Sequence, residues 1–139
     1  MFDVKYVSDS DRAFWFSLDK HLSESEFALK VQDRRGYIIL SNETPVGIMR
    51  YNLFWDSIPF LNLIYIDDAY QGMGYGKQAM LFWENEMRKL GYVAVMTSTQ
   101  TDEQAQHFYR KLGYIEKGSL FFDNTPFEQP LEIIMMKTL

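Results

Sequence analysis

The hydrophobic and polar positions of the chain follow two different periods. Apolar residues stand at every second position in several short stretches, a pattern that predicts half-buried β-strands. Strands are expected over residues 2–7, 37–40, 46–55, 60–66, 92–99, 114–122 and 131–137. Elsewhere apolar residues recur every third or fourth position, which predicts two helices after the polar segments 8–11 and 23–26, one over residues 74–90 and one through residues 105–112.

Residue types that favour helix ends stand beside these helices. Arg34, Arg35 and Gly36 predict the end of the second helix, because cations suit the last turn and glycine suits the position just past it. A contact of the two arginines with substrate is the alternative interpretation. Thr101 or Asp102 is expected to cap the last helix.

The connections between the strands predict how they pair. Short turns join residues 37–40 to 46–55 and 46–55 to 60–66, so these strands should run antiparallel. A whole helix joins residues 60–66 to 92–99, which predicts a parallel pair with a right-handed crossover. The order of elements predicts a single α/β (α+β mixed) domain over residues 1–139. Its central mixed, mostly antiparallel sheet should carry helices on both faces.

A glycine-rich segment lies between the strand of residues 60–66 and the following helix. Residues 71–77 read Gln-Gly-Met-Gly-Tyr-Gly-Lys. The first N–H groups of a helix have no partner within it, and glycines let an anion approach the backbone closely. The pattern therefore predicts a phosphate or pyrophosphate site. The alternative is that the glycines only permit a tight turn.

Two well-known phosphate loops fit this segment poorly. A Walker loop would need a leading glycine where Tyr70 and Gln71 stand. Residues 74–79 match the G-x-G-x-x-A pattern of dinucleotide-binding domains, but the strand of residues 92–99 ends without the acidic residue that binds the ribose. A fragment of an NAD-binding oxidoreductase therefore stays as a minor alternative.

Composition excludes several classes of protein. The net charge of −5 disfavours a nucleic-acid partner, which would need a basic face. The absence of cysteine excludes disulfides, cysteine zinc sites and a cysteine nucleophile, and with His21 and His107 far apart in sequence no metal site is expected. No signal peptide and no apolar run of about 20 residues is found. We therefore expect no membrane partner and a cytoplasmic location.

Two motifs together resemble one family. Gln71, Gly74 and Gly76 form the pattern Q-x-x-G-x-G, and residues 105–114 form A-x-x-F-Y-x-x-x-G-Y. This pair, in this order and with this succession of elements, is similar to the GCN5-related N-acetyltransferases (GNAT family). The resemblance implies the GNAT acyl-CoA N-acyltransferase fold and acetyl-CoA as cosubstrate, without a metal. It also implies acetyl transfer to a primary amine of a small-molecule or peptide acceptor by direct attack in a ternary complex.

The resemblance also assigns roles to residues. Tyr109 would be catalytic and would protonate the leaving thiolate, since a phenol with a pKa near 10 is protonated at neutral pH; the alternative is a packed core tyrosine. The cofactor-binding residues would be Leu63, Ile64, Tyr65, Ile66, Gln71, Gly72, Met73, Gly74, Tyr75, Gly76 and Lys77. A backbone N–H around residues 64–66 would support the oxyanion.

The group that takes the proton of the amine is left open. The candidates are Tyr65, Asn62, Asp67, Asp68 and His107. Asp102 stands where many members of the family carry a cofactor-contacting asparagine, so no cofactor contact is assigned to it. The interpretation from a different class is a non-catalytic acyl-CoA-binding or sensing module.

The acceptor pocket implied by the resemblance lies between residues 11–35 and 123–130. Its aromatic candidates, each of which could instead belong to the core, are Trp15, Phe54, Trp55, Phe121, Phe122 and Phe127. They indicate a small or apolar acceptor. An exposed last strand and the surplus of aromatic residues also predict a homodimer.

Overall fold

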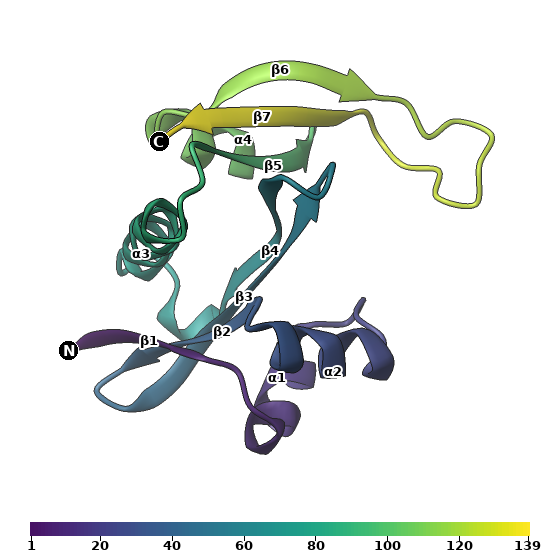
Figure 1. Cartoon of the computed structure of the whole chain (residues 1–139). Coiled ribbons are helices and arrows are strands. Elements are labelled where there is room, and N and C mark those ends of the chain that lie inside the picture. The colour runs from purple at the N-terminus through teal and green to yellow at the C-terminus, as the bar shows by residue number, and fades with distance from the viewer. The chain divides into compact units, whose positions relative to one another are not determined.

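The computed structural model describes all 139 residues, and its elements follow the expected order (Figure 1). The strands are β1 (Phe2–Tyr6), β2 (Gly36–Ser41), β3 (Thr44–Phe54), β4 (Ile58–Ile66), β5 (Ala94–Gln100), β6 (Ile115–Leu120) and β7 (Glu132–Thr138). The helices are α1 (Arg12–Leu18), α2 (Glu24–Asp33), α3 (Tyr75–Lys89) and α4 (Ala105–Lys111), with short 3-10 helices at Asp9–Asp11 and Asp68–Tyr70.

The strands form one mixed sheet in the order β1-β2-β3-β4-β5-β7-β6. The pairs β1–β2, β2–β3, β5–β7 and β6–β7 are antiparallel. β4 and β5 are parallel, with Phe60 opposite Met96 and Leu61 opposite Thr97. The prediction of a mixed, mostly antiparallel sheet with this one parallel crossover is confirmed.

The last strand is not at an edge of the sheet. β7 lies between β5 and β6, with Ile133 opposite Thr99 on one side and opposite Ser119 on the other. The prediction of an exposed last strand is therefore wrong. The hairpin of β6 and β7 inserts its second strand beside β5, which leaves β6 as the edge, and all six residues of β6 are exposed.

The chain forms two compact units. Unit 1 comprises Met1–Asn52 and Asn62–Glu86, and unit 2 comprises Leu53–Leu61 and Met87–Leu139. The chain passes from one unit to the other within β3, β4 and α3. No helix in the structure is both long and apolar enough to span a lipid bilayer.

Helices cover both faces of the sheet in unit 1, as the alternation along β2 shows. Ile38 packs in a buried cluster with Trp15 of α1 and Phe27 of α2. The neighbouring Tyr37 meets the ring of Phe82 in α3, with ring centroids 6.2 Å apart. Because successive strand residues point to opposite faces, α1 and α2 cover one face and α3 covers the other. Each large apolar side chain buried here contributes about 1.5–3 kcal/mol.

The end of α2 differs from the expectation. Ser23 caps its start as predicted, since its hydroxyl accepts the N–H of Glu26. Arg34 takes the left-handed conformation that ends the helix, at φ 56°, and Gly36 is already the first residue of β2. A Cβ on Gly36 would come within 2.8 Å of Val7. The glycine therefore serves close packing and not the helix end.

Two further boundaries were predicted wrongly. α4 begins at Ala105 behind Gln104, which makes no side-chain cap, so neither Thr101 nor Asp102 caps it. The turn between β3 and β4 is made by Trp55 and Asp56, both with positive φ, and β4 begins at Ile58, two residues before the expected start at residue 60. Local residue preferences alone did not place these ends.

Candidate active site

The glycine-rich segment forms an open loop ahead of α3. Gly72 and Gly74 have φ angles of 78° and 85°, a left-handed conformation that residues with a Cβ adopt only with strain. A Cβ built on either glycine would meet nothing within 4 Å. The first hydrogen bond of α3 runs from the N–H of Gln78 to the carbonyl of Gly74 (3.1 Å), so the amides of residues 75–77 have no acceptor within the helix.

The charge around this loop fits an anionic group. The start of a helix carries partial positive charge, and the first turn of α3 contains no acidic residue. Lys77 is exposed in that turn, within the same segment as Gly76. Met73 is 60% exposed at the tip of the loop. The predicted loop residues thus present backbone amides and one cation toward solvent.

The side chains of Gln71 and Tyr75 tie the glycine loop to neighbouring segments of unit 1. Gln71 donates through Nε2 to the carbonyl of Ile66 (2.9 Å) and to Oδ1 of Asp68 (3.1 Å). The hydroxyls of Tyr75 and Ser41 share a hydrogen bond of 2.6 Å. The first pair of bonds folds the loop back onto the end of β4, and the last ties the start of α3 to the end of β2.

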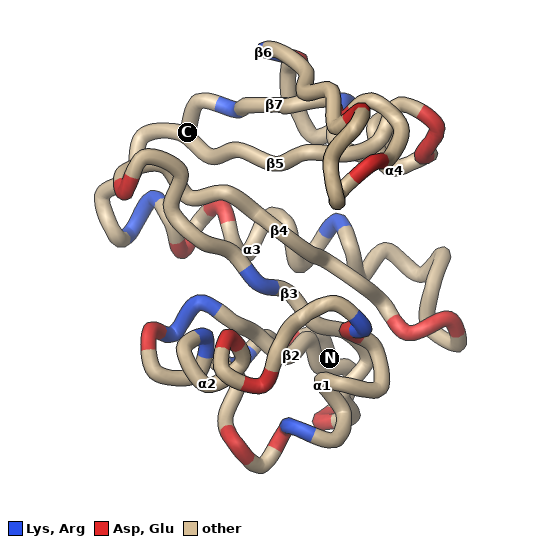
Figure 2. The backbone as a smooth tube through the Cα atoms, turned by 90° about the vertical axis from the view of Figure 1, so that its right-hand side faces the viewer, with Lys and Arg blue, Asp and Glu red and all other residues tan.

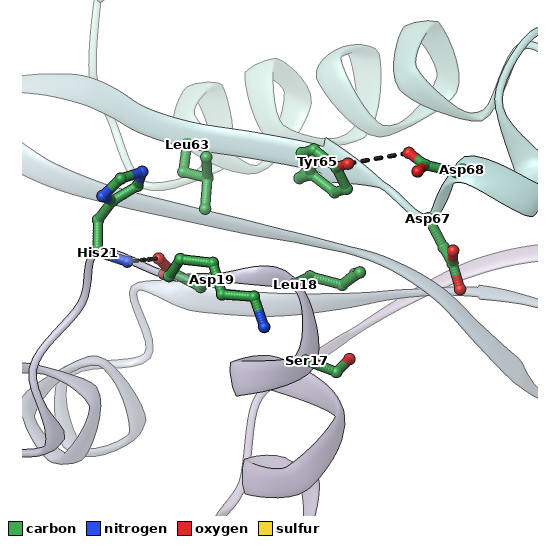
Figure 3. A pocket seen from close by; sticks show the side chains of 9 residues that line it. Ser17, Leu18, Asp19, His21, Leu63, Tyr65, Asp67 and Asp68 are labelled. Atoms are coloured by element: carbon green, nitrogen blue, oxygen red, sulfur yellow. Dashed lines mark hydrogen bonds between the residues drawn. The ribbon is translucent and has the colours of Figure 1, made fainter.

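The predicted strand segment, Leu63 to Ile66, forms the end of β4. It follows the two residues of β4 that pair with β5. Figure 3 shows Leu63 and Tyr65 along one side of β4, two positions apart. The alternate residues, Ile64 and Ile66, are half-buried. The side chains of Leu63 and Tyr65 therefore line a pocket of unit 1. Residues 67–70 connect the end of β4 to the glycine loop.

Tyr109 belongs to unit 2 and is buried on α4, 7% exposed. Its ring lies edge-on to Tyr114, with centroids 5.8 Å apart. Burial raises the pKa of Tyr109 above its usual value, and a hydrogen bond with Thr97 opposes this shift in part. The hydroxyl of Thr97 in turn donates to the carbonyl of Leu61 in β4 (3.1 Å). Tyr109 is therefore held as a neutral phenol beside β5.

A pocket of about 440 Å³ lies in unit 1 (Figure 3). The end of α1 and the following loop form one wall, and β4 with the residues after it forms the other. The lining residues are Ser17, Leu18, Asp19, Lys20, His21, Leu63, Tyr65, Asp67 and Asp68. The volume is within the range that small-molecule sites occupy.

A buried ion pair stiffens the α1 wall of this pocket. Asp19 accepts Nε of Arg50 at 2.8 Å and Nε1 of Trp15 at 3.2 Å. It also accepts the backbone N–H groups of His21 and Leu22. Burial alone would raise the pKa of Asp19, but these hydrogen bonds, led by the one from Arg50, lower it. The negative charge of Asp19 is thus neutralised inside the protein.

The opposite wall carries acceptor oxygens. Tyr65 donates its hydroxyl proton to Oδ1 of Asp68 at 2.9 Å, and Figure 3 shows the hydroxyl pointing to that carboxylate. Because Tyr65 donates its proton to this carboxylate, the hydrogen bond to Asp68 is the main reason that the pKa of Tyr65 is raised. Figure 2 shows an acidic segment where β4 ends, which is Asp67 and Asp68.

The aromatic residues expected at the acceptor pocket do not line this one. Trp15 is fully buried in the core of unit 1, which agrees with the core alternative given for it and not with a place in the acceptor pocket. Trp55, Phe121 and Phe127 are exposed in unit 2. The pocket residues Asp19 and Lys20 were missed as individuals, although they lie within the predicted segment 11–35. The sequence did contain one indication of this wall. Asp19 follows Trp15 by four positions, a spacing at which two side chains on a helix are neighbours.

The residues that the sequence suggested for taking the proton of the amine divide into two groups. Tyr65, Asp67 and Asp68 line the pocket. Asn62 and His107 are exposed and do not line it. Asp102 is exposed in the turn before α4.

Comparison with known proteins gives consistent matches. A relative named as the uncharacterized N-acetyltransferase YbbJ of Bacillus subtilis (strain 168) is 26% identical over 131 residues, which cover 81% of this chain and 76% of the relative. Ard1 from Thermoplasma volcanium superposes with a TM-score of 0.84 at 15% identity, over 99% of this chain and 97% of that one. Naa50 of Arabidopsis thaliana, in complex with the bisubstrate analogue CoA-Ac-MVNAL, superposes with a TM-score of 0.80 at 15% identity, over 99% of each chain.

The structural matches are below 25% identity and show the fold. The family itself is shown by a sequence model described as the acetyltransferase (GNAT) family, which matches residues 4–114. That range includes both the glycine loop and the helix of Tyr109. This chain belongs to the acetyltransferase (GNAT) family and is an acetyl-CoA-dependent N-acetyltransferase.

Proposed function

We propose that this protein transfers the acetyl group of acetyl-CoA to a primary amine of a small-molecule or peptide acceptor while both substrates are bound. The observation that carries the proposal is the loop of residues 71–77. Two left-handed glycines there open the backbone ahead of a helix of 15 residues. The CoA-linked analogue bound to the Naa50 neighbour supports the same assignment by similarity.

Each part of the loop then has a physical role. The amides at the start of α3 bind the pyrophosphate, and Gly72 and Gly74 let it approach the backbone. Lys77 adds a cation, and Gln71 keeps the loop on the end of β4 through its two hydrogen bonds. Met73, Tyr75 and Gly76 contribute backbone. Leu63 to Ile66 offer backbone groups to the pantetheine arm in the manner of an added strand.

The reaction needs few chemical groups from the protein. The thioester supplies an activated acetyl group, so the amine nitrogen forms the new C–N bond directly as the C–S bond breaks. Tyr109, kept protonated by burial, donates its proton to the departing sulfur and regains one from solvent. Tyr65, Asp67 and Asp68 are the candidates for taking the proton of the amine, because they line the pocket of unit 1.

Thermal unfolding with four ligands tests the cofactor first. A ligand that binds only the folded state stabilises by roughly 2.7 kcal/mol at about 100 times its Kd, which raises Tm by several degrees. We expect a rise with acetyl-CoA and CoA, and none with NAD or ATP. A folded sample that responds to neither CoA form would contradict the pyrophosphate loop and the transferase mechanism with it.

An amine screen that follows CoA release then tests catalysis. Turnover with at least one amine, lost in Tyr109→Phe, would support the proposal. Binding of acetyl-CoA without turnover of any amine would favour the sensing module instead. The homodimer and the cytoplasmic location stay predictions of the sequence, and light scattering on the purified chain tests the first.

A further inference from the structure

The residues that line the pocket of unit 1 indicate what kind of acceptor would bind there. Leu63 and Tyr65 line it from the strand segment that we propose to hold the pantetheine arm. An acceptor in this pocket would therefore lie along the backbone at which the acetyl group is delivered. This step rests on the proposed function. What the pocket adds is the chemistry of its polar groups.

The hydroxyl of Tyr65 can act toward a ligand only as an acceptor. Its single proton is donated to Asp68 at 2.9 Å, which leaves only oxygen lone pairs toward the pocket. Asp68 is fixed in turn by Nε2 of Gln71 at 3.1 Å. An ammonium or amine N–H is the complement of such an acceptor.

The charges of the pocket point the same way. Asp19 is neutralised by Arg50, so the carboxylates that contribute net charge are Asp67 and Asp68. On the opposite wall, Lys20 directs its Nζ to the carbonyl of Phe16 at 3.1 Å. Figure 3 shows His21 at the end of the pocket away from Asp67 and Asp68. One end of the pocket therefore presents only oxygen acceptors.

We propose that Tyr65 is an acceptor-binding residue that receives an N–H of the attacking amine, and that Asp67 and Asp68 select acceptors with a second cationic group. The substrate class is a compact diamine or an amine with a neighbouring cation. The volume of about 440 Å³ accommodates such a molecule. An amine whose other end is a carboxylate is disfavoured, because its negative charge meets two carboxylates.

Three amines with one four-carbon skeleton test the charge preference in the unaltered protein. Diaminobutane, butylamine and aminobutyrate carry a second group that is positive, neutral or negative. We expect kcat/KM to fall in that order, by about tenfold or more from first to last. Equal values, or a preference for aminobutyrate, overturn the proposal. If none is acetylated, calorimetric titration of diaminobutane into the protein with CoA decides: no binding also overturns it.

Variants of the acidic residues test the origin of the preference. Asp67→Asn and Asp68→Asn should each bring the ratio of kcat/KM between diaminobutane and aminobutyrate closer to one. Glu43→Gln, an exposed change on the β2–β3 turn of the same unit, is the matched control and should leave the ratio unchanged. A ratio that survives both aspartate changes contradicts the assignment.

The role of Tyr65 has its own readout. Tyr65→Phe should raise KM for diaminobutane about tenfold with a smaller change in kcat, and Kd for acetyl-CoA should stay the same. Tyr92→Phe serves as the tyrosine control. An unchanged KM in Tyr65→Phe would remove Tyr65 from the acceptor site. Acetyl-CoA binding in these same samples separates a failure of this inference from a failure of the proposed function.

Discussion

Asp19 and Arg50 form an ion pair in which Oδ2 and Nε lie 2.8 Å apart and the carboxylate is completely buried. The pair joins the loop after α1 to β3. The same carboxylate accepts the N–H groups of His21 and Leu22. One buried charge therefore holds the backbone of the loop after α1, which forms part of one wall of the pocket.

Breaking this pair should be expensive. Asp19→Ala is expected to lower the free energy of unfolding by about 3–5 kcal/mol, because Arg50 is left without its partner in the interior. Urea unfolding of the purified variant measures the loss. The double variant Asp19→Leu with Arg50→Met should lose less than the sum of the two single changes, since it leaves no uncompensated charge. Additive losses would contradict a direct coupling.

Asp19 should also make stability depend on acidity. Its pKa is lowered in the folded protein because the hydrogen bonds led by Arg50 outweigh burial. The contribution is therefore complete above the pKa of an unfolded aspartate, about 3.9, and is lost as the pH falls from there through the folded pKa. The stability difference between the wild type and Asp19→Asn should shrink over this window. A constant difference in urea titrations at pH 6 and at lower pH would refute the assignment.

Lys30 should make the free energy of unfolding depend on pH in the alkaline range. It is 6% exposed, and its Nζ donates to the carbonyl of Tyr51 at 3.0 Å. Burial, followed by the charge of Arg50, lowers the pKa of Lys30. The unfolded chain therefore binds this proton more tightly, and the free energy of unfolding rises as the pH increases from the folded pKa toward about 10.4. Lys30→Met should lack this rise when both proteins are unfolded in urea across that range.

Tyr109→Phe should separate catalysis from binding. We expect turnover to fall by about one to two orders of magnitude with Kd for acetyl-CoA unchanged, since only the proposed proton donor is removed. Because burial raises the pKa of Tyr109, its deprotonation should not reduce kcat below about pH 10. Steady-state kinetics at saturating substrates measure both effects. Full turnover in the variant would return Tyr109 to a packing role.

Two glycines in the same conformation allow a matched test of the loop. Gly74 and Gly91 have φ angles of 85° and 93°, and a Cβ at either position would meet nothing within 4 Å. Gly74→Ala and Gly91→Ala should each cost about 1 kcal/mol of stability through backbone strain. Only Gly74→Ala should weaken acetyl-CoA binding, measured by calorimetry. Equal affinity in the two variants would contradict a phosphate contact at Gly74.

Local signals were sufficient where neighbours in sequence decide the structure. Ser23 caps α2 through the N–H of Glu26, three residues later. The alternation of Tyr37 and Ile38 places their side chains on opposite faces of β2. The crossover through α3 makes β4 and β5 parallel. In each case the cause lies within a few residues or in the handedness of the chain.

Other features depend on contacts between distant segments. Position 36 favours glycine because a Cβ there would come within 2.8 Å of Val7, and not because a helix ends there. Arg34, which ends α2, places its guanidinium over the ring of Tyr6. The central position of β7 depends on its pairing with both β5 and β6. None of these contacts can be predicted from the local sequence of the segment that makes it.

The sequence by itself determined the order of elements, the mixed sheet and the family, since periodicity, crossover length and two short motifs are local properties. It also placed the glycine loop ahead of α3, where the free amides of a helix start are a consequence of its geometry. The pocket of unit 1 was decided only by tertiary structure. Asp19 faces Arg50 across 31 positions, and the loop after α1 meets Tyr65 and Asp68 only in the folded unit. Long-range packing brings these charges together, and no local pattern encodes it.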